Sequence, residues 1–153
     1  MLHSWATKQA VRALGYGASC KVAIYFKTPW WQLDPYRINK GGVARTDLPL
    51  RVCVYPSYNI EDKLNPGWNP EKPAVLLCSY TWGQDAQRIG SLISRKSPIG
   101  ENQLKSVLLH NLALLHTESE DEYKGLLDRL KNVEYKTHHA YEYVSIFSFS
   151  CSS

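Results

Sequence analysis

The sequence predicts a single domain of class α+β or α/β, because strand-like and helix-like segments interleave along the chain. Apolar and polar side chains alternate in residues 21–27 and 50–55, and residues 74–80 form an almost continuous apolar run. Apolar side chains recur at helical spacing in residues 5–14, 81–93, 104–115 and 119–130. With 153 residues, 44% of them hydrophobic, the chain is long enough to bury one core.

The N-terminal part predicts a helix and then a half-buried strand. Ser4 stands where an N-cap belongs, and Gly15 and Gly17 end the helix predicted over residues 5–14. In the following strand, residues 21–27, apolar side chains alternate with a second set that includes Lys21 and Tyr25. The strand ends at Thr28-Pro29, since proline cannot donate to a strand ladder.

The middle of the chain predicts two further strands separated by irregular segments. Residues 32–49 contain Gly41-Gly42 and Pro49 and are expected to be irregular. Residues 50–55 alternate and predict the second strand, whereas residues 56–73 hold four prolines and predict a long surface loop. The apolar run at residues 74–80 is typical of a strand in the centre of a sheet.

Two capping boxes predict helix starts in the C-terminal half. Thr81-x-x-Gln84 predicts a helix to about Ile93, and Ser119-x-x-Glu122 predicts one with Leu126 and Leu130 on its apolar face. Between them, residues 104–115 predict another helix. The last ten residues are uncharged and rich in serine, and they predict either an edge strand or a disordered tail.

Several function classes find no support in the composition. The net charge of +4 is spread along the chain, so no basic stripe indicates nucleic-acid binding. No apolar run approaches the roughly 20 residues that span a bilayer, and no leader pattern opens the chain, so neither membrane insertion nor secretion is expected. The four cysteines form no C-x-x-C pair and are expected to be buried free thiols. His138-His139 are adjacent and lack a carboxylate or cysteine cluster, so no metal site is expected.

Three blocks carry a resemblance to a known family. They are Lys21–Trp31 (KVAIYFKTPWW), Gly41–Pro56 (GGVARTDLPLRVCVYP) and Ala74–Leu92 (AVLLCSYTWGQDAQRIGSL). Together they resemble the substrate domain of flavin-dependent amine oxidases, most closely the L-amino-acid oxidase branch. The resemblance implies an α+β fold with a mixed β-sheet and flanking helices. It covers residues 1–143 as a partial substrate domain and leaves 144–153 as a divergent serine-rich tail.

The resemblance also implies roles for individual residues. Lys21, in the family's K-x-x-x-x-F/Y-K-x-x-W motif, would reach the flavin N5 through a water and act as a catalytic and cofactor-binding residue. Tyr80, in Y-x-x-G-x-D-A, would hydrogen-bond the substrate carboxylate, and Trp82 would line the substrate pocket. Tyr143, where the family has tryptophan, would be a cofactor-binding residue at the start of a flavin-contacting region. From the residues alone, Lys21 also fits a strand-edge lysine reaching water, and Tyr80 a core tyrosine.

The T-D-L-P-x-R block, Thr46 to Arg51, is expected to be structural, with Asp47 capping a turn and pairing with Arg51. Gly15-Tyr16-Gly17 lacks the third glycine of a phosphate loop and precedes a strand. The sequence therefore contains no dinucleotide-binding fingerprint, and tight binding of FAD by this chain alone is not expected.

The implied chemistry is oxidation of an L-amino acid to an imino acid, which hydrolyses to a keto acid and ammonia, while dioxygen becomes hydrogen peroxide. The implied partners are FAD, a small amino acid or amine substrate, and the missing remainder of the oxidase. Two other interpretations stay open: a non-enzymatic remnant of a truncated gene that binds no cofactor, and a segment of a related amine oxidase.

Overall fold

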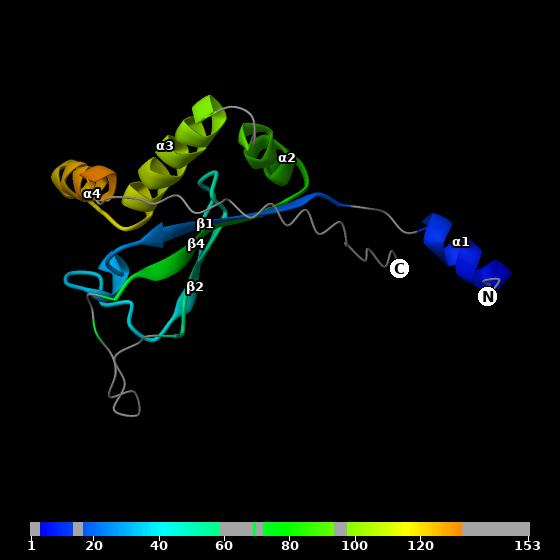
Figure 1. Ribbon diagram of the computed structural model, residues 1–153, viewed down its shortest axis with the longest axis horizontal. Helices are drawn as coiled ribbons and strands as arrows, with labels where there is room; N and C mark the ends of the chain where they lie inside the picture. The colour runs from blue at the N-terminus through cyan, green and yellow to red at the C-terminus, as the bar shows by residue number, and fades with distance from the viewer. Residues whose placement is uncertain (1–3, 14–16, 59–68, 70–71, 94–97, 133–153) are drawn as a thin grey trace.

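A small sheet with helices packed on one face forms the body of the protein, as the computed structural model shows (Figure 1). The structure describes residues 4–13, 17–58, 69, 72–93 and 98–132. Its strands are β1 (Ser19–Phe26), β2 (Gly42–Arg45), β3 (Val52–Tyr55) and β4 (Ala74–Trp82). Its helices are α1 (Trp5–Ala13), the 3₁₀ turn η1 (Trp30–Gln32), α2 (Gly83–Leu92), α3 (Pro98–Leu115) and α4 (Glu120–Asn132).

The four described strands are ordered β1-β4-β3-β2, and every pairing among them is antiparallel. The α+β class is confirmed, but the expected mixed sheet is wrong for this part of the chain. Parallel pairs need a crossover of a dozen or more residues, usually a helix, between the strands. Here α2, α3 and α4 all follow the last strand, so none of them joins two strands of this sheet.

Buried and more exposed side chains alternate along the strands, so the sheet has one face covered by helices and one open face. Cys20, Val22, Ile24 and Phe26 are buried on the covered face, where α2 and α3 supply Ile89, Leu104, Leu108 and Leu112. The intervening side chains of β1, Lys21, Ala23 and Tyr25, are only half-buried, because they lie on the face opposite the helices. Figure 1 shows these helices gathered on one side of the sheet.

A register shift in β1 decides which side chains of β4 reach the open face. Val22 pairs with Ser79 but Ala23 pairs with Leu77, so Cys78 has no partner of its own across the ladder. As a result Cys78 and Ser79 are buried in succession, and the alternation changes phase. Tyr80 and Trp82 therefore join Val75 and Leu77 on the open face.

The helix starts differ in how well the sequence predicted them. Ser4 caps α1, since its Oγ accepts the backbone N–H of Thr7 at 3.2 Å, as predicted. The box before α4 is also confirmed, because Ser119 Oγ accepts the Glu122 N–H at 3.3 Å and Glu122 Oε2 accepts the Ser119 N–H at 3.4 Å. The described side chains of α1 are exposed, and the helix stands apart from the sheet in Figure 1.

The box predicted at Thr81 is wrong. Strand β4 continues to Trp82, so Thr81 points into the core and its Oγ1 donates to the Cys20 carbonyl at 3.4 Å. Helix α2 begins instead at Gly83, whose φ of +58° turns the chain and whose N–H donates to the Ala18 carbonyl at 2.8 Å. A positive φ is cheap only for glycine, which explains the residue at this position.

Strand β2 lies inside the segment that was expected to be irregular. It pairs with β3 from Gly42↔Tyr55 to Arg45↔Val52, and the hairpin between them spans residues 46–51. Strand β3 begins at Val52 rather than Leu50, because Leu50 and Arg51 belong to that hairpin turn. Most of the loop predicted over residues 56–73, the tail at 144–153 and Tyr143 lie outside the described residues.

Candidate functional site

Three of the residues singled out in the sequence meet on the open face. Lys21 in β1 lies directly across the ladder from Tyr80 in β4. The Lys21 Nζ stands 4.6 Å from the centroid of the Tyr80 ring, and the Tyr80 and Trp82 rings lie 4.1 Å apart with a 42° angle between their planes. The structure thus brings Lys21, Tyr80 and Trp82 into one row, here called the aromatic row.

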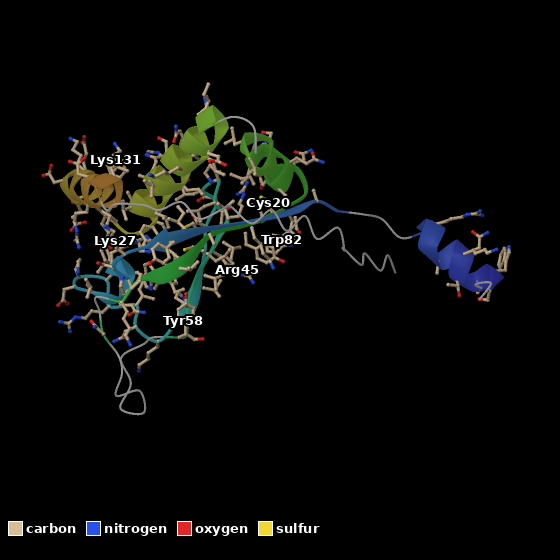
Figure 2. The ribbon with its side chains drawn as sticks, viewed as in Figure 1. Cys20, Lys27, Arg45, Tyr58, Trp82 and Lys131 are labelled. Atoms are coloured by element: carbon tan, nitrogen blue, oxygen red, sulfur yellow. The ribbon has the colours of Figure 1, made fainter. Side chains whose placement is uncertain are left out.

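The aromatic row is open to solvent on its outer side. Trp82 exposes 52% of its surface, while Lys21 and Tyr80 are half-buried. Figure 2 places Trp82 near the start of β1 close to Cys20, and Lys27 toward the other end of that strand. A lysine ammonium over an aromatic face at a partly exposed site contributes about 0.5–1 kcal/mol, so the row orders the Lys21 side chain without removing its charge from water.

Beyond the row, the open face is largely apolar. Val43 and Val75 expose 58% and 41% of their surfaces on it, and the half-buried Val54 and Leu77 fill the gap between β2 and β1. Charged side chains at its margins are Lys21 and Arg45, which belong to the two outer strands. Such a face suits a second layer, or a ligand with an apolar part and an anionic group.

The turn between β2 and β3 corrects one expectation. Arg51 does not pair with the Asp47 carboxylate; it donates from Nη1 to the Asp47 carbonyl at 2.9 Å and from Nε to Asp85 Oδ2 at 2.8 Å. The turn is capped by Thr46, whose Oγ1 accepts the Leu48 N–H at 3.2 Å. The exposed carboxylate of Asp47 instead accepts a hydrogen bond from the neighbouring Thr46 Oγ1 at 3.3 Å.

Arg51 holds an unfavourable backbone conformation. Its φ is +58°, in the left-handed region, which costs a side chain other than glycine about 1–3 kcal/mol. Its ion pair with Asp85 is partly exposed, with side chains 39% and 26% accessible, and pairs of this kind contribute about 0–1 kcal/mol. The ion pair alone offsets at most part of this cost, whereas glycine would adopt the same backbone without strain.

The Y-x-x-G-x-D-A motif divides into structural and outward-facing residues. Gly83 supplies the positive φ that starts α2, and Ala86 is buried against the sheet at 3% exposure. Asp85, in the first turn of α2, accepts from Arg51 and also from Arg88 Nη1 at 3.4 Å. Tyr80 remains as the motif residue that faces the open side.

A partly buried polar pair on the covered face was not predicted. His116 Nδ1–H donates to the Leu112 carbonyl at 2.6 Å, so Nε2 is the acceptor for the Tyr55 hydroxyl at 2.5 Å. Burial lowers the pKa of His116, partly opposed by the bond to Leu112, and burial raises the pKa of Tyr55. The ring of Trp30 packs edge-on against His116 at 4.9 Å. Sequence spacing could not reveal a pair 61 residues apart.

The cysteines of the core are free thiols, as predicted for the three that the structure describes. Cys20, Cys53 and Cys78 are buried, and none of the three is in a disulfide. Burial raises the pKa of Cys53 to about 12 and raises that of Cys78 as well, so neither thiol is a nucleophile at neutral pH. Among the described residues no cluster of His, Cys, Asp or Glu could hold a metal, and no described helix could cross a membrane; His138-His139 lie outside them.

The described residues fit one end of a flavin. Lys21 offers a half-buried ammonium beside an aromatic surface, which suits the electron-rich edge of an isoalloxazine ring. A pyrophosphate needs a glycine turn at a helix N-terminus after a strand. Gly83 is the single glycine at the β4–α2 junction, where the loop carries the bulky Trp82 instead of further glycines. The described residues therefore suit the ring end of a flavin and not its pyrophosphate.

Comparison with known proteins identifies relatives of most of the chain. The family described as flavin containing amine oxidoreductase matches residues 2–149. L-amino-acid oxidase 4 of Hebeloma cylindrosporum is 40% identical over 130 residues, which cover 81% of this chain and 19% of that protein. An L-amino-acid oxidase of Siganus canaliculatus is 33% identical over 110 residues, covering 72% and 18%. The flavin-dependent L-tryptophan oxidase RebO of Lentzea aerocolonigenes is 29% identical over 110 residues, covering 72% and 20%. The chain thus spans about a fifth of the length of these relatives.

Proposed function

Because the chain belongs to the flavin containing amine oxidoreductase family, in its L-amino-acid oxidase branch, we propose that it supplies one wall of an amino-acid oxidation site. The observation that carries the proposal is the aromatic row, in which a cation, a phenol and an indole meet on the open face of the sheet. These three groups match the needs of a ligand with a carboxylate, an apolar side chain and a neighbouring cofactor.

Tyr80 is proposed to hold the substrate carboxylate. Its ring is fixed between Lys21 and Trp82, so its hydroxyl is presented at a constant place on the open face. A hydroxyl that donates to a carboxylate makes a charge-assisted hydrogen bond, which contributes about 1.5–3 kcal/mol. The Lys21 ammonium, close to the same ring, adds favourable electrostatics for an anion bound there.

Lys21 is proposed to face the ring end of FAD. When bound, the flavin supplies the two-electron acceptor for the oxidation of the amino acid. Lys21 provides a fixed positive charge beside that ring and can hold a water by donating a hydrogen bond from Nζ. Because Nζ is held over Tyr80, its position does not have to be ordered anew when the substrate binds.

Trp82 is proposed to contact the side chain of the substrate. Its indole is more than half exposed and continues the surface of the Tyr80 ring, so it offers a broad apolar plane. A flat or apolar amino-acid side chain gains most from such a surface. The relative from Lentzea aerocolonigenes is named as an L-tryptophan oxidase, which agrees with an aromatic substrate.

The opposite wall and the pyrophosphate site are proposed to come from outside this chain. The open face lacks a second layer in the part that the structure describes, and the sequence has no G-x-G-x-x-G. We therefore expect the chain by itself to be catalytically inactive. An absorbance spectrum taken after incubation with FAD and removal of free cofactor should show no flavin bands, and retained bands would overturn this expectation.

Activity is tested by transferring the chain into a relative. The 130 aligned residues of the Hebeloma cylindrosporum oxidase are replaced by those of this chain, and the chimera is first checked for bound flavin by absorbance. Peroxide release is then measured across L-amino acids, with aromatic and large apolar ones expected to give the highest kcat/KM. A flavin-loaded chimera that oxidises no L-amino acid would refute the proposal.

Two variants of the chimera test the roles, and a third serves as a control. Tyr80→Phe should raise KM roughly 10- to 150-fold, which corresponds to the loss of about 1.5–3 kcal/mol of carboxylate binding. Tyr25→Phe is the matched control, because it removes a hydroxyl from the same face of the sheet opposite Val75, away from the row. Equal effects of the two substitutions would remove Tyr80 from the site. Lys21→Met should lower the rate of oxidation while leaving substrate KM less affected.

A further inference from the structure

The half-buried Arg51–Asp85 ion pair joins two distant segments at the edge of the candidate site. Arg51 lies in the β2–β3 turn and Asp85 in the first turn of α2, 34 residues later. Arg51 is itself anchored by the Asp47 carbonyl, so its guanidinium bridges the turn and the helix. The turn also reaches β4 directly, since Ser79 Oγ donates to the Leu50 carbonyl at 3.0 Å and both residues are fully buried.

The start of α2 determines where Trp82 points. Trp82 is the last residue of β4 and the N-cap of α2, and Gly83 follows it with a positive φ. Glycine at this joint leaves the chain free to pivot, because it adopts many backbone conformations at little cost. The Gly83 N–H bond to Ala18 fixes one side of the joint, and the Asp85 bond to Arg51 fixes the other. The Arg51–Asp85 ion pair thus limits the backbone motion that Gly83 would otherwise allow at this joint.

The conformation of Arg51 supports a role other than stability. Glycine would adopt its left-handed backbone at less cost, and the partly exposed ion pair returns at most about 1 kcal/mol, so stability alone does not call for arginine in this turn. Strained residues of this kind persist where the surrounding structure needs the side chain in one place.

We propose that Arg51 is a positioning residue, which acts through Asp85 to fix the start of α2 and thereby the indole of Trp82 in the aromatic row. The geometric part of this inference stands on its own contacts, whereas its meaning for catalysis rests on the proposed function. The prediction is that loss of the guanidinium moves Trp82 and leaves the tryptophans of the core in place.

The test uses the whole chain labelled with 5-fluorotryptophan and read by fluorine NMR. The five tryptophans give separate probes, with Trp82 assigned by Trp82→Phe and the buried Trp30 and Trp31 serving as internal references. Arg51→Gly removes the guanidinium but suits the positive φ, and Asp85→Asn removes the partner charge. In both variants the Trp82 resonance should shift or broaden while the Trp30 and Trp31 resonances keep their positions.

Two further variants separate positioning from general effects. Arg88→Gln removes the second, more exposed cation beside Asp85 and should leave the Trp82 resonance in place. Arg51→Lys should restore it in part, because an ammonium can still reach Asp85. In the double variant Arg51→Gly with Asp85→Asn, the Trp82 shift should not exceed that of the larger single variant.

Unchanged Trp82 resonances in both Arg51→Gly and Asp85→Asn would overturn the inference, as would equal shifts of all the tryptophans. Asp85→Asn keeps the inference testable if Arg51→Gly does not fold. The NMR result is independent of oxidase activity, so failure of the proposed function would leave a Trp82 shift intact. In the flavin-loaded chimera, Arg51→Gly should raise KM for aromatic substrates more than it lowers kcat.

Discussion

Replacing Gly83 by alanine isolates the energetic cost of the turn that separates β4 from α2. The residue has φ of +58°, and a Cβ added there would meet no atom within 4 Å. Steric crowding is therefore absent, and the backbone conformation alone sets the effect. A left-handed conformation costs an L-residue about 1–2 kcal/mol relative to glycine.

Gly90 provides the matched control for this substitution. It lies in the same helix, and a Cβ added at Gly90 also meets nothing within 4 Å, but the φ of Gly90 is not positive. Alanine reduces the freedom of the unfolded chain equally at both positions, by about 0.4–1 kcal/mol. At Gly90 that term is expected to be accompanied by better helix propensity, so Gly90→Ala should stabilise the fold by about 0.5–1 kcal/mol.

The two variants should differ by about 1–2 kcal/mol in the free energy of unfolding, with Gly83→Ala the less stable. Urea unfolding followed by circular dichroism measures both on one scale, and equal slopes would show that the unfolded states are comparable. If Gly83→Ala stabilises the protein as much as Gly90→Ala does, the turn does not hold its positive φ in solution. The reasoning about Trp82 and α2 would then fail as well.

Three other outcomes are expected on the same chain. Ser119→Ala should destabilise the fold by about 1 kcal/mol in urea unfolding, because the Glu122 N–H loses its cap, whereas Ser91→Ala in the exposed last turn of α2 should cost less. Burial lowers the pKa of His116, so the folded state favours the neutral ring. The contribution of His116 to the free energy of unfolding should therefore be fully present above pH 6.5 and fall as the pH drops below 6.5, by at most about 1.4 kcal/mol per pH unit. His116→Gln should remove that pH dependence. Burial raises the pKa of Cys53 and Cys78, so iodoacetamide at pH 8 should leave both thiols unlabelled in the folded chain and label both in urea. Peptide mass mapping measures the labelling. Labelling of the folded chain at the rate of a free thiol would contradict the burial of these side chains.

The sequence predicted the elements whose signal is local. The strand at β1, the apolar run at β4 and the Ser119–Glu122 box are each specified by neighbouring residues, and each appears where it was expected. Strand β2 was missed because its four residues begin with Gly42, and its partner β3 stabilises it through pairing that no local pattern reveals. The false box at Thr81 has the same origin. A threonine in a strand that faces the protein core, as Thr81 does in β4, and a threonine that caps a helix look alike in sequence.

The candidate site was predictable from motifs, and its geometry was not. Lys21, Tyr80 and Trp82 were singled out separately, but their meeting depends on the register Lys21↔Tyr80, which the shift at Val22/Ala23 sets. The partner of Arg51 was predicted wrongly, because Asp47 is close in sequence and Asp85 is close in space. Tyr143 lies outside the described residues, so its proposed role beside the flavin stays a prediction.

The family motifs separate into two groups with different physical requirements. Thr46, Gly83 and Ala86 are explained by a cap, a positive φ and a tightly packed helix, which are properties of this chain by itself. Lys21, Tyr80 and Trp82 satisfy no such need, since they lie on a face that the helices do not cover, and an exposed indole contributes little to folding. The second group therefore fits a function completed by atoms outside the sheet. Arg51 belongs to both groups, because its backbone is part of the turn while its side chain controls the joint beside the row.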